Sequence, residues 1–315
     1  MPPTASATTD TDMAVRAAWM HFAGGYTQAE VADRLGLSKL KAHRLITRAN
    51  REGMVQVYVD GDVSECLELE KQLSGLFDLS YCEVIPDFDR DPLPLKALGI
   101  AGGQYLRRLL NGSTVDSVGI CHGRTLAACV EHIPHTRNAE VQFVSLLGGF
   151  SKKFSANPHD VIHRLAERTG AQAYVMPVPF LADTVQDHDV LMSQRGLKEV
   201  IEKARCTPLK VVGIGAVSHD ASLVATGMID ESEFSLVSDA GGVGELLGHY
   251  FTESGDPAKT TLSDRTMGLA VDDLHDGEII AVAGGKNKSA AIAAVLNSRL
   301  LSGLITDEHT ARMLV

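Results

Sequence analysis

The chain has 315 residues, a length that suggests about two domains, and 44% of them are hydrophobic. This composition is ordinary for a folded globular protein and excludes collagen-like, disulfide-scaffold and intrinsically disordered chains. No stretch approaches the roughly 20 apolar residues of a membrane helix. Residues 1–12 lack the basic start and apolar middle of a signal peptide, so we expect a disordered leader on a cytoplasmic protein.

The net charge of −11 is unevenly distributed along the chain. Residues 13–53 contain seven Lys or Arg and three Asp or Glu side chains, whereas the remainder is strongly acidic. A basic segment at one end of an acidic chain is typical of a polyanion-binding module. A solvated basic helix face would give the same composition.

Residues 13–60 are predicted to form a helix-turn-helix domain with a winged-helix-like strand. Thr27 and Glu30 have the spacing of a capping box at the start of a helix, and Gly36 allows the tight turn after it. The predicted helices cover residues 13–23, 28–35 and 39–52, and the predicted strand covers residues 54–59.

The third of these helices carries most of the basic side chains. Lys39 and His43 lie near its start, where a recognition helix meets base edges, and Arg48 lies further along, where contact with phosphates is expected. We therefore predict that this helix binds DNA. The candidate DNA-binding residues are Gln28, Ser38, Lys39, Lys41, Ala42, His43, Arg44 and Arg48.

Residues 61–80 are predicted to be a linker that contains a helix over residues 64–77, with leucines at helical spacing. This helix either joins the basic domain to the rest of the chain or pairs with another subunit.

From residue 81 to the end, short apolar runs alternate with helical stretches. This alternation predicts an α/β domain, with a mostly parallel sheet covered on both faces and a ligand site at the carboxyl ends of the strands. The predicted strands cover residues 81–85, 117–121, 141–147, 173–176, 211–214 and 278–283. The predicted helices cover residues 94–110, 124–132, 158–169, 289–301 and 307–314.

Four glycine-rich turns at predicted strand ends are candidates for binding a small ligand. Gly-Arg-Thr at residues 123–125 opens a helix whose first amides, with the guanidinium and the hydroxyl, suit an anion. Glu245 lies in a second turn, placed to accept hydrogen bonds from ligand hydroxyls. Lys286 and Lys288 follow a third turn and can neutralise a phosphate, and Gly-Gly at residues 148–149 forms the fourth. Each turn taken alone also fits an ordinary strand-to-helix connection.

Other chemistries are not indicated. The five cysteines have irregular spacings without a Cys-x-x-Cys pair, and no His, Cys and Asp cluster has metal-ligand spacing. Residues 212–217 lack the third glycine of a dinucleotide-binding motif. We expect no disulfide, no metal and no cofactor.

Three motifs of the chain resemble the SorC family of sugar-responsive transcriptional regulators. They are Gly-Arg-Thr-Leu at residues 123–126, Gly-Val-Gly-Glu-Leu-Leu-Gly at residues 242–248 and Ala-Gly-Gly-Lys-x-Lys-x-x-Ala-Ile at residues 283–292. The helix-turn-helix and the segment at residues 304–311 also look like this family. The resemblance covers nearly the whole chain, in the right order.

The resemblance implies an effector domain over residues 81–315, similar in fold to sugar-phosphate isomerases and CoA transferases. In the family such a domain binds a sugar or sugar phosphate and controls affinity for double-stranded operator DNA. Residues 157–160 and 174–180 look like a branch that responds to a polyol such as erythritol. We expect a repressor that acts as a dimer or tetramer and is not an enzyme.

The effector site combines the positions that the resemblance implies with those at the strand ends. The candidate residues are Gly119, His122, Gly123, Arg124, Thr125, Gly148, Gly149, Asn157, Asp183, Glu245, Lys286 and Lys288. His159 and Gln186 lie in the same sugar-contacting loops.

Two other functions fit part of the sequence. A sugar-phosphate isomerase-like enzyme would use Glu245 as a general base and Lys288 to hold phosphate. A DNA-binding structural protein would leave the anion-binding turns without a role. The basic helix-turn-helix argues against the enzyme, and the turns argue against the structural protein.

Overall fold

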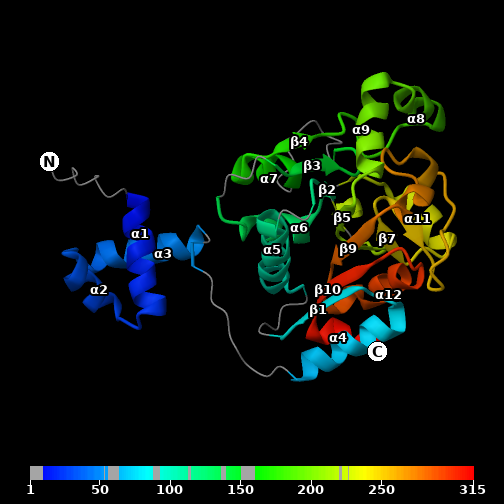
Figure 1. Cartoon of the computed structure of the whole chain (residues 1–315). Coiled ribbons are helices and arrows are strands. Elements are labelled where there is room, and N and C mark those ends of the chain that lie inside the picture. Colours follow the sequence, from blue (N-terminus) through cyan, green and yellow to red (C-terminus); the bar gives the residue numbers. More distant parts are fainter. Residues whose placement is uncertain are drawn as a thin grey trace. The chain divides into compact units, whose positions relative to one another are not determined.

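The structure is a computed structural model, and its described part forms two compact units (Figure 1). We call the described residues from 10 to 55 the head and those from 64 to 131 and from 140 to 315 the body, and each is described by itself. No helix in these ranges is long and apolar enough to cross a membrane. The described residues are 10–52, 54–55, 64–87, 93–112, 115–135, 140–149, 160–219, 222–225 and 227–315.

The head is a bundle of three helices, as predicted. Helix α1 begins at Asp10, so the helix starts inside the segment that was predicted to be a disordered leader. It continues into a π-helical turn that ends before Gly24, and most of the predicted wing strand lies outside the described residues. The elements are α1 (Asp10–Ala18), the π-helical turn (Trp19–Ala23), α2 (Gln28–Leu35) and α3 (Lys39–Arg51).

The helix boundaries of the head are set by local capping. The Thr27 amide donates to Glu30 Oε2 at 2.8 Å and the Glu30 amide donates to Thr27 Oγ1 at 3.3 Å, which confirms the capping box. Gly36 has a positive φ of 64° at the end of α2, where a side chain would be strained. Ser38 caps α3 by accepting from the amide of Lys41 at 3.2 Å.

Small side chains fill the core of the head. Alanine lets the helices approach closely, and Val31, Leu45 and Ile46 supply most of the remaining buried apolar surface. The buried alanines are Ala14, Ala17, Ala18, Ala32, Ala42 and Ala49.

The body is built on a seven-stranded sheet in the order β1-β10-β9-β5-β2-β3-β4, in which every neighbouring pair is parallel. All carboxyl ends therefore lie at one edge, where the sequence predicted the ligand site. The strands are β1 (Tyr81–Ile85), β2 (Ser117–Ile120), β3 (Gln142–Ser145), β4 (Gln172–Tyr174), β5 (Leu209–Val212), β9 (Glu278–Val282) and β10 (Gly303–Asp307).

Each of the six predicted strands is present, with shifts of at most two residues at the ends. The seventh strand, β10, was missed, because its residues were taken only as part of a family motif. It lies between β1 and β9 and is buried along its whole length.

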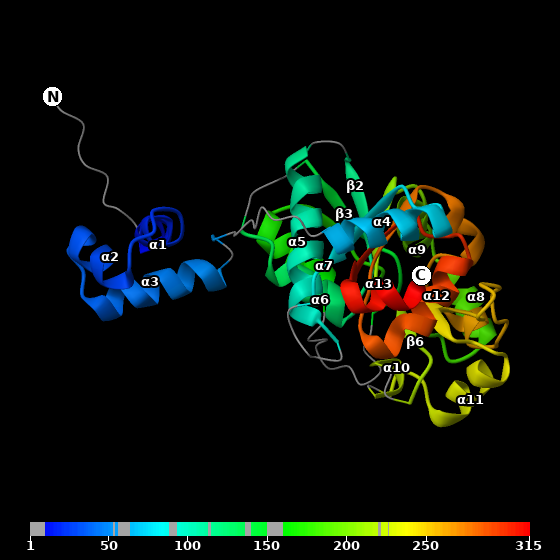
Figure 2. The same cartoon turned by 90° about the horizontal axis from the view of Figure 1, so that it is seen from below.

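Helices α5, α6 and α7 pack side by side and form one layer against the sheet (Figure 2). Helices α4 and α13 pack on each other and on strands β1 and β10. The body helices of eight residues or more are α4 (Ser64–Phe77), α5 (Leu95–Gly112), α6 (Arg124–Glu131), α7 (Val161–Thr169), α8 (Val185–Met192), α9 (Arg195–Arg205), α11 (Glu231–Asp239) and α12 (Ser289–Asn297). The shorter ones are α10 (Ser222–Ala225) and α13 (Glu308–Leu314).

A second, antiparallel sheet follows β5 in the chain. It consists of β6 (Gly215–Ala216), β7 (Gly244–Leu246) and β8 (His249–Phe251), and α12 packs against it. A Cβ on Gly244 would lie 2.4 Å from the carbonyl oxygen of Ala291, so this glycine allows the close approach of α12. The sheet was not predicted, since its strands are only two or three residues long.

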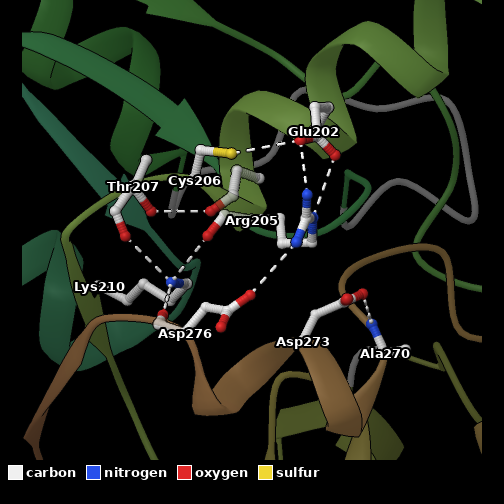
Figure 3. Close-up of polar contacts among 9 residues, drawn as sticks. Glu202, Arg205, Cys206, Thr207, Lys210, Ala270, Asp273 and Asp276 are labelled. Atoms are coloured by element: carbon white, nitrogen blue, oxygen red, sulfur yellow. Dashed lines mark hydrogen bonds and ion pairs between the residues drawn. The ribbon is translucent and has the colours of Figure 1, made fainter.

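A fully buried lysine fixes the amino-terminal part of β5 (Figure 3). Lys210 Nζ donates to the carbonyl oxygens of Arg205 at 3.3 Å and Thr207 at 3.1 Å, and also to that of Asp276. All three ammonium hydrogens therefore have acceptors. The network joins the end of α9 to the turn that precedes β9.

Candidate functional site

Helix α3 is amphipathic. Its apolar side chains are buried in the core of the head, and its basic side chains are exposed on the opposite side. An exposed basic face at the start of the second helix of a helix-turn-helix is the surface that enters the major groove in such folds. The exposed candidates are Ser38, Lys39, Lys41, His43 and Arg44.

Two of the candidates from different helices are in contact. His43 Nδ1 lies 3.0 Å from Gln28 Oε1, so the first residue of α2 orients a side chain of α3.

Arg48 is half-buried and donates from Nε to Glu52 Oε1 at 2.9 Å. This ion pair means that Arg48 must share its charge between Glu52 and any phosphate.

The structure corrects the assignment of Ala42. Its side chain is completely buried in the core of the head, because α3 turns this position toward α1 and α2. Ala42 therefore packs the head and is not available to contact a base.

The second candidate site lies at the carboxyl ends of three adjacent strands, β9, β5 and β2. Lys288, which precedes α12, donates from Nζ to the carbonyl oxygen of Ile214 at 2.7 Å. This bond joins the turn after β9 to the turn after β5. Burial lowers the pKa of Lys288, and the nearby charge of Arg124 lowers it further, whereas Glu245 acts in the opposite direction.

Glu245 lies on strand β7, whereas the sequence had suggested that it lies in a loop. Its Oε1 accepts from the amide of Gly248 at 2.6 Å. A Cβ on Gly215, its partner on β6, would lie 2.2 Å from Glu245 Oε2, so only glycine leaves room for this carboxylate. Burial raises the pKa of the Glu245 carboxyl, and the Gly248 amide and Lys288 oppose this rise.

The turn after β2 supplies the third part of the site. Gly123 has a φ of 129°, and Arg124 begins α6 with an exposed side chain. Thr125 is buried beside it. His122 precedes them, and burial lowers its pKa, which favours a neutral imidazole that can donate or accept.

The structure therefore brings together Arg124, Lys288 and Glu245, which the sequence placed in three separate turns. Two cations and one carboxylate at adjacent strand ends can bind an anionic group and a hydroxyl group of one small ligand. Among the described residues, no group of His, Cys, Asp and Glu could hold a metal ion.

Three predicted glycines have structural roles instead. A Cβ on Gly119, inside β2, would lie 2.5 Å from Leu146 Cδ2, so this position is explained by packing in the sheet. The amides of Gly148 and Gly149 donate to the carbonyl oxygens of Met267 and Val178 at 2.7 and 2.9 Å. Since these N–H groups are engaged, they are not donors for a ligand.

The remaining candidates are less closely tied to the site. Lys286 and Asp183 are exposed, and Gln186 is exposed on α8. Asn157 and His159 lie outside the described residues.

Sequence reasoning missed the residues that hold the site in shape. Gly215 belongs to the segment that was set aside as an incomplete dinucleotide-binding motif, and Ile214 lies next to it. The paired glycines of that segment were a usable signal, since glycine in a strand often marks close approach of another group.

A helix-turn-helix with an exposed basic helix, in a chain whose α/β body gathers charged side chains at the carboxyl edge of its sheet, is typical of a ligand-responsive DNA-binding regulator. The comparisons agree with this class. The Sugar-bind family model, which describes a sugar-binding domain, matches residues 61–315. The chain is 49% identical over 306 residues to the erythritol catabolism regulatory protein EryD of Brucella abortus, covering 97% of both chains.

It is also 30% identical over 311 residues to the transcriptional regulator LsrR of an Enterobacter species, covering 97% of this chain and 93% of that one. The full-length sorbitol operon regulator SorC of Klebsiella pneumoniae has a similar structure, with a TM-score of 0.75, 25% identity and coverage of 98% and 99%. The chain belongs to the SorC family of sugar-binding transcriptional regulators. It is a regulator and not an enzyme, so the isomerase alternative is set aside.

Proposed function

We propose that this regulator is a repressor of a polyol or sugar catabolic operon, and that a small effector bound at Arg124, Glu245 and Lys288 lowers its affinity for operator DNA. The observation that carries this proposal is that Lys288 is hydrogen-bonded to Ile214, next to Gly215, the β6 partner of Glu245, and lies within electrostatic reach of both Glu245 and Arg124. The name of the Brucella relative supports erythritol as the effector. The two cations of the site also suit a phosphorylated four-carbon compound such as erythrose 4-phosphate.

Recognition of DNA is assigned to α3 of the head. Lys39, Lys41 and His43, the last oriented by Gln28, contact base edges, and Arg44 contacts phosphate. The exposed, basic start of α3, capped by Ser38, supports this assignment.

The assignment is tested on an operator duplex that is selected from random DNA with the wild-type protein. Lys39→Ala is expected to reduce discrimination between operator and scrambled DNA. Arg44→Ala is expected to weaken binding to both sequences equally and to reduce the salt slope by about one. Arg195→Ala, on the exposed surface of α9, is the control. Equal discrimination by all variants would contradict a recognition role for α3.

The effector is tested by thermal unfolding with erythritol and with erythrose 4-phosphate. A ligand at 100 times its Kd stabilises the protein by about 2.7 kcal/mol. If the effector is phosphorylated, erythrose 4-phosphate stabilises the wild type and not Arg124→Ala. If it is the neutral polyol, erythritol stabilises both. Release of operator DNA by the active compound identifies a repressor, and tighter binding would identify an activator.

We propose in addition that the DNA-bound form is a dimer or tetramer. One helix-turn-helix reads few base pairs, and symmetric half-sites require paired heads. Helix α4 is the candidate contact, since its Leu67 and Leu76 side chains are about half exposed. The mass of the complex on a single operator duplex, measured by analytical ultracentrifugation, tests this, and one chain per duplex would rule it out.

A further inference from the structure

Asp307 is a buried carboxylate at the end of β10, and its three side-chain hydrogen bonds connect two parts of the body. Its Oδ2 accepts from the amide of Gly285 at 2.8 Å and from the Thr310 hydroxyl at 2.7 Å, while its Oδ1 accepts from the amide of Thr310 at 2.9 Å. The side chain is 3% exposed. A buried carboxylate with three donors is held in one orientation.

The first part is the turn that presents Lys288. The Gly285 amide also donates to the Thr310 hydroxyl at 2.8 Å, and Gly285 has a φ of 106°. A Cβ on Gly284 would lie 2.1 Å from Asp307 Oδ2, so the chain closes directly onto the carboxylate. Three residues after Gly285, Lys288 reaches the Ile214 carbonyl oxygen. The geometry of this lysine turn, residues 284–288, therefore depends on Asp307.

The second part is the helix pair α13 and α4. Asp307 caps the amino terminus of α13, and α13 packs against α4. Arg312 on α13 pairs with Glu65 in the first turn of α4 and with Glu308. Helix α4 is the first described helix of the body after the head in the chain, so α13 contacts the part of the body that is nearest to the head in sequence.

We propose that Asp307 is a positioning residue that couples the lysine turn to α13 and α4, and so transmits occupancy of the effector site toward the head. This inference rests on the proposed function, because it requires an effector at Lys288. Asp307 itself touches no ligand. A ligand that draws the lysine turn inward moves the Gly285 amide, and the carboxylate carries that movement to Thr310 and the start of α13.

The test compares Asp307→Asn with variants that separate coupling from folding. Asparagine is a good helix cap, so α13 is retained. When its one oxygen caps the Thr310 amide, its NH2 group takes the place of Oδ2 and cannot accept from the two donors that meet there. Thr310→Val removes the hydroxyl that bridges Asp307 and Gly285, and Thr310→Ser restores it. Asp230→Asn is the matched control, since Asp230 caps α11 in the same way, at a different helix.

Two measurements are made on the full chain. Hydrogen exchange without ligand is expected to be faster at residues 285–288 and in α4 for Asp307→Asn and Thr310→Val, and unchanged for Thr310→Ser and Asp230→Asn. Titration of the operator complex with erythritol and erythrose 4-phosphate is expected to show a response at least about tenfold weaker in the first two variants, with operator affinity in the absence of ligand unchanged.

The outcomes distinguish this inference from the proposed function. If the wild type responds, Lys288→Met does not, and Asp307→Asn responds normally, the coupling role is wrong and the effector site stands. If Lys288→Met and Glu245→Gln both respond like the wild type, the proposed site is wrong. Unchanged exchange in both segments of Asp307→Asn overturns the coupling role even without a ligand. Loss of response in Asp230→Asn would reduce the effect to general destabilisation.

Discussion

Two lysines lie at or near the two ends of the same strand, β5, and their hydrogen bonding differs. Lys210 belongs to the amino-terminal part of β5, and its ammonium group donates to three backbone carbonyl oxygens. Lys288 reaches the turn after its carboxyl end, where its one described hydrogen bond goes to the Ile214 carbonyl oxygen. Burial lowers the pKa of both ammonium groups.

The difference indicates what each end of the sheet does. At the amino-terminal end the protein satisfies the buried charge completely, which favours a fixed structure. At the carboxyl end a second cation, Arg124, lies near Lys288, and the half-buried Glu245 offsets only one of the two charges. An arrangement with a surplus of positive charge is suited to receive a ligand.

The largest expected effect is the loss of stability in Lys210→Met. The substitution leaves three buried carbonyl oxygens without their donor, so we expect a loss of about 3 kcal/mol, or roughly 6–12 °C in Tm. Thermal unfolding measures it, and Lys198→Met on the exposed face of α9 is the control. The effector response of the folded fraction should be normal. A Tm within two degrees of the control would show that the network is dispensable.

The same substitution at the other end, Lys288→Met, should have the opposite profile. It removes a half-buried charge with a single described hydrogen bond, so stability without ligand should change little. The response to a phosphorylated effector should fall by at least about tenfold, since a charge-assisted contact is lost. Operator release measured by fluorescence anisotropy checks this. A large fall in Tm together with a normal effector response would show that Lys288, like Lys210, stabilises the fold and does not bind the effector.

A smaller effect is expected from Gly215→Ala. Its methyl group would displace the Glu245 carboxylate, so effector affinity should fall severalfold, by about 1 kcal/mol. A Cβ on Gly213, two residues earlier, meets nothing within 4 Å, so Gly213→Ala is the control. Equal affinity of the two variants, measured by calorimetry, would place the ligand away from Glu245.

The smallest effect is a pH dependence in Glu245→Gln. Burial raises the folded-state pKa of Glu245, so the native state holds this proton more tightly than the unfolded state. The contribution of Glu245 to stability therefore falls as pH rises from its ordinary pKa to the raised one. The glutamine variant should gain stability over the wild type as pH rises through this window, and then keep a constant advantage. Unfolding at a series of pH values measures it, with Glu199→Gln as the exposed control.

Much of the fold could be predicted because its signals are local. Thr27 and Glu30 form a capping box by spacing alone, and the alternation of apolar runs with helical stretches predicted a parallel sheet. Strand β10 was not predicted, because its five residues are all buried and show no alternation of apolar and polar side chains.

The sequence by itself determined the head, the parallel sheet, and the turns that carry Arg124 and Lys288, since each depends on residues only a few positions apart. Only the tertiary structure decided which groups meet across the chain. Lys288 reaches Ile214, Glu245 lies against Gly215, and Asp307 holds Gly285, over separations of 74, 30 and 22 residues. These contacts depend on strand order and on the space that glycine leaves, and neither is encoded in local spacing.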